Sequence, residues 1–375
     1  MRIAILHNHD HALLEEDPGR EAREDVVRVA AAIRSALIKS KHAVQLIPVE
    51  QDLLGLHEAI VGDKPDVVVN LCESLAADAR GEMLVPAMLD LLQVPYTGNS
   101  ALSLALALHK NKAKEILRAR GVPTPDFCII SHVEDLTQVD LPFPLIVKPS
   151  REDASMGIDF DSVVHTRQQL GRAVSKVLRT FRQPALVEQF IVGREVYVPV
   201  LGNTARRALP LSEIRFGNAF VGKPHVVSYK AKWDTESAEC IESPSVLATL
   251  PRSVEARCVE VAMAAFEALE CRDYGRVDLR VDEDGQPYVI DINPNCDLHP
   301  QAGFAKAAEA AGLSYADLAL HLVDLASERR NGNQAPRAAR PDAPRRAAEP
   351  YRDLHTGRGV VRARAHRRRA HAQSP

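Results

Sequence analysis

A pair of apolar segments in the last third of the chain constrains the fold more than any other feature. Gly275–Val281 and Tyr288–Pro294 each alternate apolar and polar side chains, and a short acidic turn with a glycine separates them. This pattern predicts an antiparallel β-hairpin. If the last residue of the first segment opposes the first residue of the second, counting inward sets Asp278 opposite Asp291. The hairpin therefore has to accommodate two facing carboxylates.

The facing carboxylates indicate a metal site. Two like charges held opposite each other destabilise a sheet unless a cation lies between them. The same counting sets Arg276 opposite Asn293, on the face that carries the two carboxylates. Two Asp and one Asn suit Mg²⁺, which takes few carboxylates together with phosphate oxygens, and Arg276 suits a phosphate or a developing oxyanion. The alternative is a solvated polar face. If the metal site is real, Asp291→Asn removes most turnover, leaves the fold intact and can stabilise the metal-free protein.

Charge and composition set the class of protein. The 375 residues are 46% hydrophobic and 26% charged, and no apolar run approaches the about 20 residues that a membrane helix needs. The six cysteines form no Cys-x-x-Cys pair. These features predict a cytoplasmic enzyme with reduced thiols. From Asn331 onward the chain has eleven arginines and three acids, a charge of +8, so the rest carries −11.

The Arg-rich segment, residues 331–375, has almost no large apolar side chains. It cannot bury a core, and we expect a basic, disordered C-terminal tail. Such a tail can touch nucleic acid or an acidic partner, or it can be a solvated extension. The acidic body argues against a nucleic-acid-binding core.

The order of apolar segments before the hairpin predicts an α/β chain. Strand, helix, strand, strand over residues 2–71 indicates a small doubly wound α/β domain, whose ligands lie at the carboxyl ends of its strands. Those ends are His7–His11 and Asn70–Ser74. A long helix is expected over Ser100–Arg120. Further strands are expected at residues 94–98, 127–131, 145–148, 185–188, 195–201 and 209–213, and further helices at 25–40, 166–180, 251–270 and 315–329.

Three further segments carry side chains suited to a nucleotide. Lys148 ends an apolar strand and so needs an anion, and the small residues at 150–157 let backbone N–H groups approach phosphate oxygens. Glu188–Glu195 offers backbone groups for an adenine edge and its last carboxylate for a ribose. Tyr229–Trp233 is expected to be extended, with both lysines pointing the same way. Taken alone, the Lys148 segment is equally compatible with a structural role, whereas Glu188–Glu195 is better explained as a strand with its turn and Tyr229–Trp233 as a solvated face.

Taken in order, these segments resemble the ATP-grasp superfamily, and specifically its D-alanine–D-alanine ligase branch. The resemblance runs from about residue 66 to about residue 326. The motifs that carry it are Val94–Gly98, Leu106–Lys110, Leu117–Pro125, Ile146–Pro149, Val187–Glu195, Tyr229–Trp233, Tyr274–Asp278 and Asp291–Asn293. It implies α/β plus α+β architecture, with a two-part ATP-grasp fold after the N-terminal domain. The expected domains are 1–99, then 100–187 and 188–330 for the two ATP-grasp halves, the second with the metal site, and 331–375 for the tail.

The resemblance implies a role for each matching residue. Those for the nucleotide would be Lys110, Lys148 and Lys232 on the phosphates, Glu188 and Ile191 at the adenine, and Glu195 at the ribose. Those for Mg²⁺ or Mn²⁺ would be Asp278, Asp291 and Asn293. Those for the reaction would be Arg276, Lys232 and Ser155, the last covering the γ-phosphate.

The implied reaction joins a carboxylate to an amine. ATP phosphorylates the carboxylate, the amine attacks the acyl phosphate, and ADP and phosphate leave. The magnesium ions, lysines and arginine neutralise the charge that accumulates during transfer. The partners are therefore small-molecule carboxylate and amine substrates, without a membrane, and the resemblance also allows a homodimer.

The departures from the branch fall on the substrate side. His7–His11 replaces the usual Gly-Gly-x-Ser-x-Glu loop. Asp153–Ser155 stands where the branch usually has a glycine followed by two serines, and Trp233 replaces a tyrosine. We therefore expect an amino acid or peptide-like substrate other than the D-alanine pair. The alternatives are a true D-alanine–D-alanine ligase, an ATP-grasp kinase with Asp297 or His299 as base, and a non-catalytic nucleotide-binding protein.

The same loops offer candidate substrate contacts. His7, His9 and His11 stand at the ligand edge of the first sheet and can touch the substrate or, alternatively, a transition metal. Glu73, Arg80 and Glu82 are further candidates for substrate contact.

Overall fold

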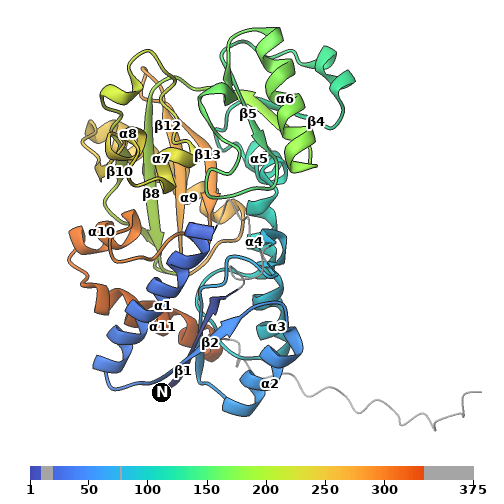
Figure 1. Cartoon of the computed structure of the whole chain (residues 1–375). Coiled ribbons are helices and arrows are strands. Elements are labelled where there is room, and N and C mark those ends of the chain that lie inside the picture. The colour runs from blue at the N-terminus through green and yellow to red at the C-terminus, as the bar shows by residue number, and fades with distance from the viewer. Residues whose placement is uncertain (10–19, 77, 333–375) are drawn as a thin grey trace, which may run out of the picture. The chain divides into compact units, whose positions relative to one another are not determined.

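Three sheets follow one another in sequence order within the part of the chain that the computed structural model describes, residues 1–9, 20–76 and 78–332 (Figure 1). Residues 1–333 form one compact unit. The predicted tail lies outside the described residues from residue 333 onward, as does His11, so both predictions stay predictions.

The first sheet is parallel and has the order β2-β1-β3, from β1 (Arg2–Asn8), β2 (Ala43–Val49) and β3 (Val67–Asn70). Helices α1 (Arg20–Lys39) and α2 (Leu53–Asp63) connect its strands. Strand β3 is buried along its whole length, as its continuous run of β-branched residues predicts. The predicted order lacked α2, because two glycines weaken the helical pattern there.

The predicted strand at residues 94–98 is instead a single bridge between Val68 and Tyr96. Helix α3 (Leu84–Leu92) precedes it, and a short 3₁₀ turn, η2 (Ala79–Gly81), lies before that helix.

The predicted single helix over residues 100–120 is wrong. The structure has two helices, α4 (Ala101–Leu108) and α5 (Lys110–Ala119), separated at His109, whose ψ is 77°. Local propensity favours a continuous helix, but the Lys110 N–H donates to the Ser150 carbonyl at 3.1 Å, outside its own helix. The break makes Lys110 the first residue of α5.

The second sheet is antiparallel and has the order β4-β7-β5-β6. Helix α6 (Arg167–Phe181) packs on it and starts at a capping box formed by Thr166 and Gln169. The strands are β4 (Phe127–Ile130), β5 (Leu145–Pro149), β6 (Val163–Val164) and β7 (Ala185–Gln189), with 3₁₀ turns η3 (Val133–Gln138) and η4 (Phe160–Ser162).

The third sheet has the order β11-β10-β8-β12-β13, with β9 on β8. Its strands are β8 (Arg194–Leu201), β9 (Arg207–Ala208), β10 (Ser212–Ile214), β11 (Ser245–Leu247), β12 (Tyr274–Val281) and β13 (Pro287–Asn293). Short strands β9 and β10 replace the single strand predicted over residues 209–213. Helix α9 (Arg252–Ala268) packs on this sheet. Between β10 and β11 the chain forms η5 (Asn218–Phe220), α7 (Tyr229–Trp233) and α8 (Ala238–Ile241).

The last helices return to the first sheet. Helix α11 (Tyr315–Gly332) packs against α1, and α10 (Gly303–Ala310) precedes it (Figure 1). One buried cluster joins Ile3 and Val69 of the first sheet to Phe304 and Leu322 of these helices. Residues far apart in the chain therefore share one core.

The predicted residue pairs of the hairpin are confirmed, but the pair at the turn from which they were counted is wrong. Arg276 pairs with Asn293, and Asp278 pairs with Asp291. The end of the hairpin is shifted by one residue, since Val281 pairs with Pro287 rather than with Tyr288, and a bulge between Asp278 and Leu279 restores the predicted register.

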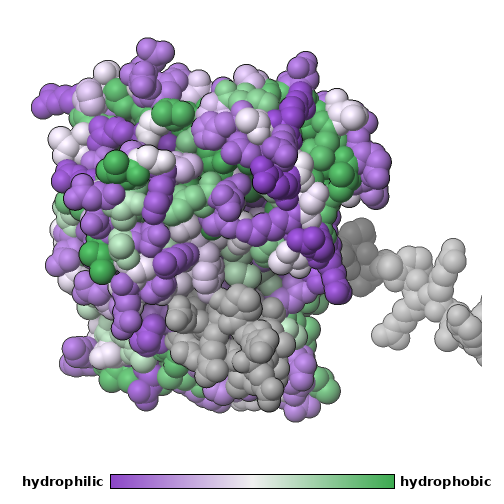
Figure 2. Space-filling view, turned by 45° about the horizontal axis from the view of Figure 1, so that its top comes forward, coloured by the Kyte–Doolittle hydropathy of each residue, from purple (hydrophilic) through white to green (hydrophobic). Residues whose placement is uncertain are grey.

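The division of residues 1–330 into three domains stays a proposal, which we adjust at one boundary. The boundary drawn between residues 187 and 188 falls inside β7. We propose to set it after Gln189, where the second sheet ends. Among the described residues, no helix is long and apolar enough to cross a membrane. Figure 2 shows hydrophilic and hydrophobic residues intermixed on the viewed face.

Candidate active site

Two adjoining cavities lie beside the hairpin. The smaller, of about 250 Å³, is bounded by strands β5, β7 and the hairpin, and by the loop after β5. It brings together every residue to which the ATP-grasp resemblance assigned a role in catalysis, nucleotide binding or metal binding. These are Lys110, Lys148, Ser155, Glu188, Ile191, Glu195, Lys232, Arg276, Asp278, Asp291 and Asn293.

Lys110 is held between two carboxylates. Its Nζ lies 2.6 Å from Asp291 Oδ2 and 3.2 Å from Asp153 Oδ1, and the residue is 7% exposed. Burial lowers the pKa of a lysine, but the two carboxylates outweigh this and raise the pKa of Lys110. The sequence did not single out Asp153, because nothing in the loop pattern distinguishes it from a solvated acid.

Asp278 has its own partners on the opposite strand and on its own strand. Arg276 donates to both of its oxygens, from Nε at 2.6 Å and from a terminal nitrogen at 2.8 Å, and Asn293 Nδ2 donates at 3.0 Å. The two facing carboxylates are therefore neutralised separately, Asp278 by Arg276 and Asp291 by Lys110. This corrects the expectation that they repel each other in the metal-free protein.

Glu188 is buried between two lysines. It contacts Lys148, and its Oε2 lies 2.7 Å from Lys114 Nζ. Burial raises the pKa of a carboxyl, but the two ammonium groups outweigh it and lower the pKa of Glu188 to about 2. Sequence reasoning missed Lys114, although its position four residues after Lys110 sets both on one helix face.

Glu195 is anchored by Arg280, a third residue that the sequence reasoning did not select. Arg280 is 3% exposed, and its guanidinium lies 3.2 Å from Glu195 Oε2. It also donates to the carbonyls of Ile191 at 3.0 Å and Gly193 at 3.1 Å. Arg280 thus fixes the turn that carries Ile191. The sequence did contain a signal for Arg280. Arg276, Asp278 and Arg280 are every second residue of β12, so their side chains lie on the same face of the sheet.

The loop after β5 closes onto helix α7. Ala154 and Ser155 have positive φ, 54° and 63°, and Trp233 Nε1 donates to the Ala154 carbonyl at 3.1 Å. Consecutive non-glycine residues in this conformation are strained and occur at functional sites. The indole that replaces the usual tyrosine therefore holds the loop in place.

The prediction that residues 229–233 are extended is wrong. They form the short helix α7, where the Ser228 hydroxyl caps the start of the helix by accepting from the Ala231 N–H. Its two lysines consequently point apart: Lys230 lies 3.5 Å from Glu239, whereas Lys232 lines both cavities.

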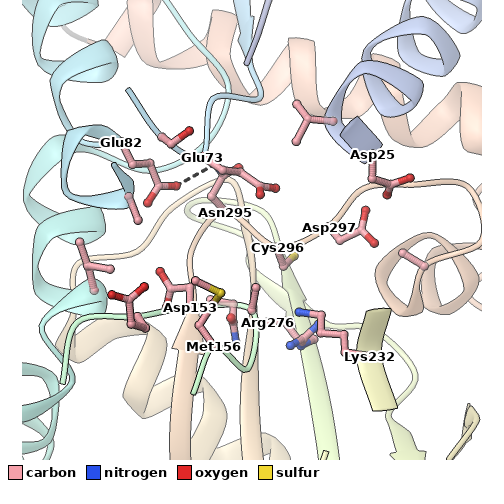
Figure 3. A pocket seen from close by; sticks show the side chains of 18 of the residues that line it. Asp25, Glu73, Glu82, Asp153, Met156, Lys232, Arg276, Asn295, Cys296 and Asp297 are labelled. Atoms are coloured by element: carbon pink, nitrogen blue, oxygen red, sulfur yellow. Dashed lines mark hydrogen bonds between the residues drawn. The ribbon is translucent and has the colours of Figure 1, made fainter. Parts of the chain in front are cut away.

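The larger cavity, of about 1070 Å³, shares Lys232, Arg276 and Asn293 with the smaller one. Figure 3 shows Glu73, Glu82 and Asp25 along one side of it and Arg276 and Lys232 along the opposite side. The acidic wall (Glu73, Glu82 and Asp25) thus faces the cations Arg276 and Lys232, which adjoin the smaller cavity together with Asp153.

The acidic wall is built on the loop after β3. Glu82 Oε1 and the Cys72 carbonyl both accept from Asn295 Nδ2 at 2.9 Å. Burial raises the pKa of Glu82, and Asp153 adds to this. The pKa of Glu73 is raised to about 8, mainly by burial and secondly by the negative charge of the nearby Asp297.

The candidate substrate contacts fall into two groups, one that lines the larger cavity and one that does not. Glu73, Arg80 and Glu82 line the larger cavity. His7 is buried beside the Asn8 carbonyl, and His9 lies 3.0 Å from Glu50, so neither is among the described residues lining the two cavities.

A magnesium ion suits the donor set at the hairpin. In the described part of the chain, no three His, Cys, Asp or Glu side chains gather as a metal site. Asp278 and Asp291 instead form a pair, and the Asn293 side-chain amide lies beside them, with its Nδ2 donating to Asp278 Oδ2 at 3.0 Å. Two carboxylates and an amide fit an ion that completes its shell with phosphate oxygens and water.

Known proteins share both the sequence pattern and the fold. Residues 116–324 match the profile described as D-ala D-ala ligase C-terminus. An uncharacterised protein, y4sG of Sinorhizobium fredii, is 35% identical over 82% of this chain and 89% of its own length. A D-alanine–D-alanine ligase of Desulforamulus reducens is 31% identical over 83% of this chain and 96% of its own.

Solved structures agree at the level of the fold. The D-alanine–D-alanine ligase of Bacillus anthracis complexed with ATP superposes with a TM-score of 0.67 at 22% identity, covering 89% of this chain and 99% of that one. The chain therefore belongs to the D-alanine–D-alanine ligase family, and its class of enzyme is that of the ATP-dependent carboxylate–amine ligases.

Proposed function

We propose that this enzyme joins the carboxylate of one amino acid or peptide-like substrate to the amine of another, and that the pair is not D-alanine with D-alanine. The observation that carries the proposal is the junction of the two cavities. The smaller contains the predicted nucleotide and metal residues, and it shares Lys232, Arg276 and Asn293 with a cavity four times its volume.

In this proposal ATP occupies the smaller cavity. Its phosphates exchange for the carboxylates that now neutralise the cations, so that Lys110 leaves Asp291, while Lys148 and Lys232 add further positive charge. Ile191 and Glu188 bound the adenine, and Glu195, fixed by Arg280, faces the ribose. Ser155, on the strained loop, covers the γ-phosphate.

Mg²⁺ or Mn²⁺ would be held by Asp278, Asp291 and Asn293, and it would supply neutralisation of the transferring phosphoryl charge. Because Lys110 and Arg276 occupy the carboxylates otherwise, we expect the metal to bind only together with ATP.

The substrate carboxylate enters from the larger cavity toward Arg276 and Lys232. These cations offset the repulsion between two anions as the carboxylate attacks the γ-phosphate. Before nucleotide and metal bind, Asp278 positions the Arg276 guanidinium through two hydrogen bonds, and Arg276 Cζ lies 4.5 Å from the centroid of the Tyr197 ring. Arg276 then stabilises the oxyanion formed when the amine attacks the acyl phosphate.

The size and lining of the larger cavity support a substrate bulkier than alanine. A volume of about 1070 Å³ is at the upper end for small-molecule sites. The usual Glu, Ser and Tyr of the branch are replaced, and the described lining includes the acids Glu73, Glu82 and Asp297.

The test is an ADP-release assay with Mg·ATP across D- and L-amino acids and dipeptides, with product mass determined. An amide product together with free phosphate supports the proposal, and Asp291→Asn should abolish it. Formation of D-alanyl-D-alanine at ordinary rates would establish the alternative that the ligase relatives suggest. A stable phosphorylated product would instead indicate a kinase, with Asp297 at the cavity as its base.

A further inference from the structure

Glu73 lines the larger cavity but takes part in none of the steps above. It follows β3 at the carboxyl edge of the parallel sheet, where sheets of this kind bind ligands. Neighbouring acids are held: Glu82 accepts from Asn295, and Asp25 lies 2.8 Å from Arg28. Among the described residues, the Glu73 carboxylate has no hydrogen bond or ion pair. It is therefore available to a ligand in the cavity.

The charges around Glu73 favour a cationic ligand. The acids that act on it are Asp297 after β13, Asp25 of α1, Asp153 of the loop after β5, and Glu82 before α3, while Lys232 of α7 opposes them. Lys232 stands on the opposite wall with Arg276, where the proposed function assigns it to phosphate (Figure 3). An ammonium ion at Glu73 would offset the remaining negative charge.

The ligation chemistry requires such a group. An amine substrate is an ammonium ion at neutral pH and has no lone pair with which to attack the acyl carbon. We propose that Glu73 binds the incoming amine as its ammonium ion and removes a proton from it, which makes Glu73 the base of the amide-forming step. This inference rests on the proposed function.

The step balances as follows in atoms and charge. The ammonium nitrogen gives one proton to the Glu73 carboxylate, and its freed electron pair forms the C–N bond with the acyl carbon. The bond between the acyl carbon and the phosphate oxygen breaks, and the phosphate leaves with the electron pair of this C–O bond. The second proton on nitrogen leaves with the phosphate, and Glu73 returns its proton to solvent. The products are the amide, phosphate and one released proton.

The pKa of Glu73, about 8, suits a base that works near neutral pH. A bound ammonium would lower it, so that the carboxylate is charged when the amine arrives and is protonated as the amine loses its proton.

Hydroxylamine separates this step from the rest of the reaction, because it is mostly uncharged at neutral pH and needs no base. The probes are D- and L-amino acids as carboxylate donors, with Mg·ATP and either hydroxylamine or a second amino acid as acceptor. We expect Glu73→Gln to keep hydroxamate formation within a few-fold of the parent and to lose amide formation by about 100-fold or more. Glu58→Gln, the same change on the exposed face of α2, should affect neither.

Two results would overturn the inference alone. One is amide formation by Glu73→Gln at the parent's rate. The other is a loss that disappears at saturating amine, since a residue that only binds the ammonium changes KM, whereas a base changes kcat. If the parent forms neither hydroxamate nor amide across the panel although it binds Mg·ATP, the proposed function fails and this inference with it.

A second variant and the pH profile guard against a folding defect. Glu73→Asp keeps the base one methylene further away, and it should recover part of the amide rate. In the parent, kcat for amide formation should rise with pH as Glu73 ionises, and Glu73→Gln should lack this rise. Loss of hydroxamate and amide together in both variants would contradict the assignment.

Discussion

At the scale of single residues, most charges of the site are paired with opposite charges of the same site. Lys110 forms ion pairs with Asp291 and Asp153, and Arg276 forms one with Asp278. The cations that we propose for phosphate binding are therefore paired with the carboxylates that we propose for metal binding. A buried charge is costly to leave unpaired. Binding Mg·ATP therefore replaces one set of ion pairs by another rather than filling a set of bare charges.

Asp291→Asn tests this exchange. Turnover with ATP should fall by about 100-fold or more, because the metal loses a carboxylate. The free energy of unfolding without nucleotide should fall by about 1–2 kcal/mol, because Lys110 keeps only the half-exposed Asp153. Urea unfolding and ADP release measure the two effects, with the exposed turn variant Asp284→Asn as control. A more stable variant would restore the earlier picture of two repelling carboxylates.

Glu73→Gln has a signature in stability that does not depend on activity. A carboxyl whose pKa is raised to about 8 on folding binds more protons in the folded state between about pH 4.5 and 8. Its contribution to stability therefore falls as the pH rises through that range. We expect the variant to gain roughly 1–3 kcal/mol relative to the parent by pH 8, and little at pH 4, in paired urea titrations. An equal difference at both pH values would show that burial does not shift this carboxyl.

At the scale of elements, Glu188 joins strands β5 and β7 to helix α5 through Lys148 and Lys114. Its pKa of about 2 lies below the ordinary value, so its contribution to stability is complete above about pH 4.5 and is lost as the pH falls toward 2. This ion triad should be one source of acid denaturation.

Glu188→Gln should lower the free energy of unfolding by about 3–5 kcal/mol at pH 7, because two buried lysines lose their shared partner. The variant should also lack much of the parent's loss of stability between pH 4.5 and 2. Circular dichroism during acid and urea titration measures both, with Glu267→Gln, exposed on α9, as control. A variant as stable as the parent at pH 7 would mean that the lysines find other partners.

At the scale of the whole molecule, Asn99 links segments far apart in the chain. Its Nδ2 donates to the carbonyls of Tyr274 at 2.8 Å and Pro294 at 2.6 Å, and its Oδ1 accepts from the Arg272 N–H at 2.7 Å. The residue is 3% exposed, so water cannot replace these partners in the folded state. The end of the proposed first domain is in this way fixed to both ends of the active-site hairpin.

Asn99→Ala should cost about 2–4 kcal/mol of unfolding free energy, since it leaves one N–H and two carbonyls without partners. The exposed variant Asn218→Ala is the matched control. Urea unfolding followed by fluorescence and by circular dichroism should show the two probes separating in the variant if the link also makes the domains unfold together. Unchanged stability would assign that coupling to the shared apolar core instead.

The sequence by itself determined the class of fold and the residues that gather around the smaller cavity, where we propose that the nucleotide binds. Alternation along the hairpin and apolar runs ending in Lys148 and Glu188 are local patterns, and local patterns survive folding because strand geometry fixes which side chains share a face. Even a wrong starting pair at the turn led to the right pairing of Asp278 with Asp291, since the bulge compensated the shift.

Only the tertiary structure decided which charges meet and what the second cavity contains. Lys114, Asp153 and Arg280 find their partners across separate elements, and no local pattern specifies such contacts. The break at His109 likewise follows from a hydrogen bond to Ser150, 40 residues later in the chain than Lys110. Glu73 acquires its raised pKa from burial and from acids on other segments, so its chemistry exists only once those segments have packed together.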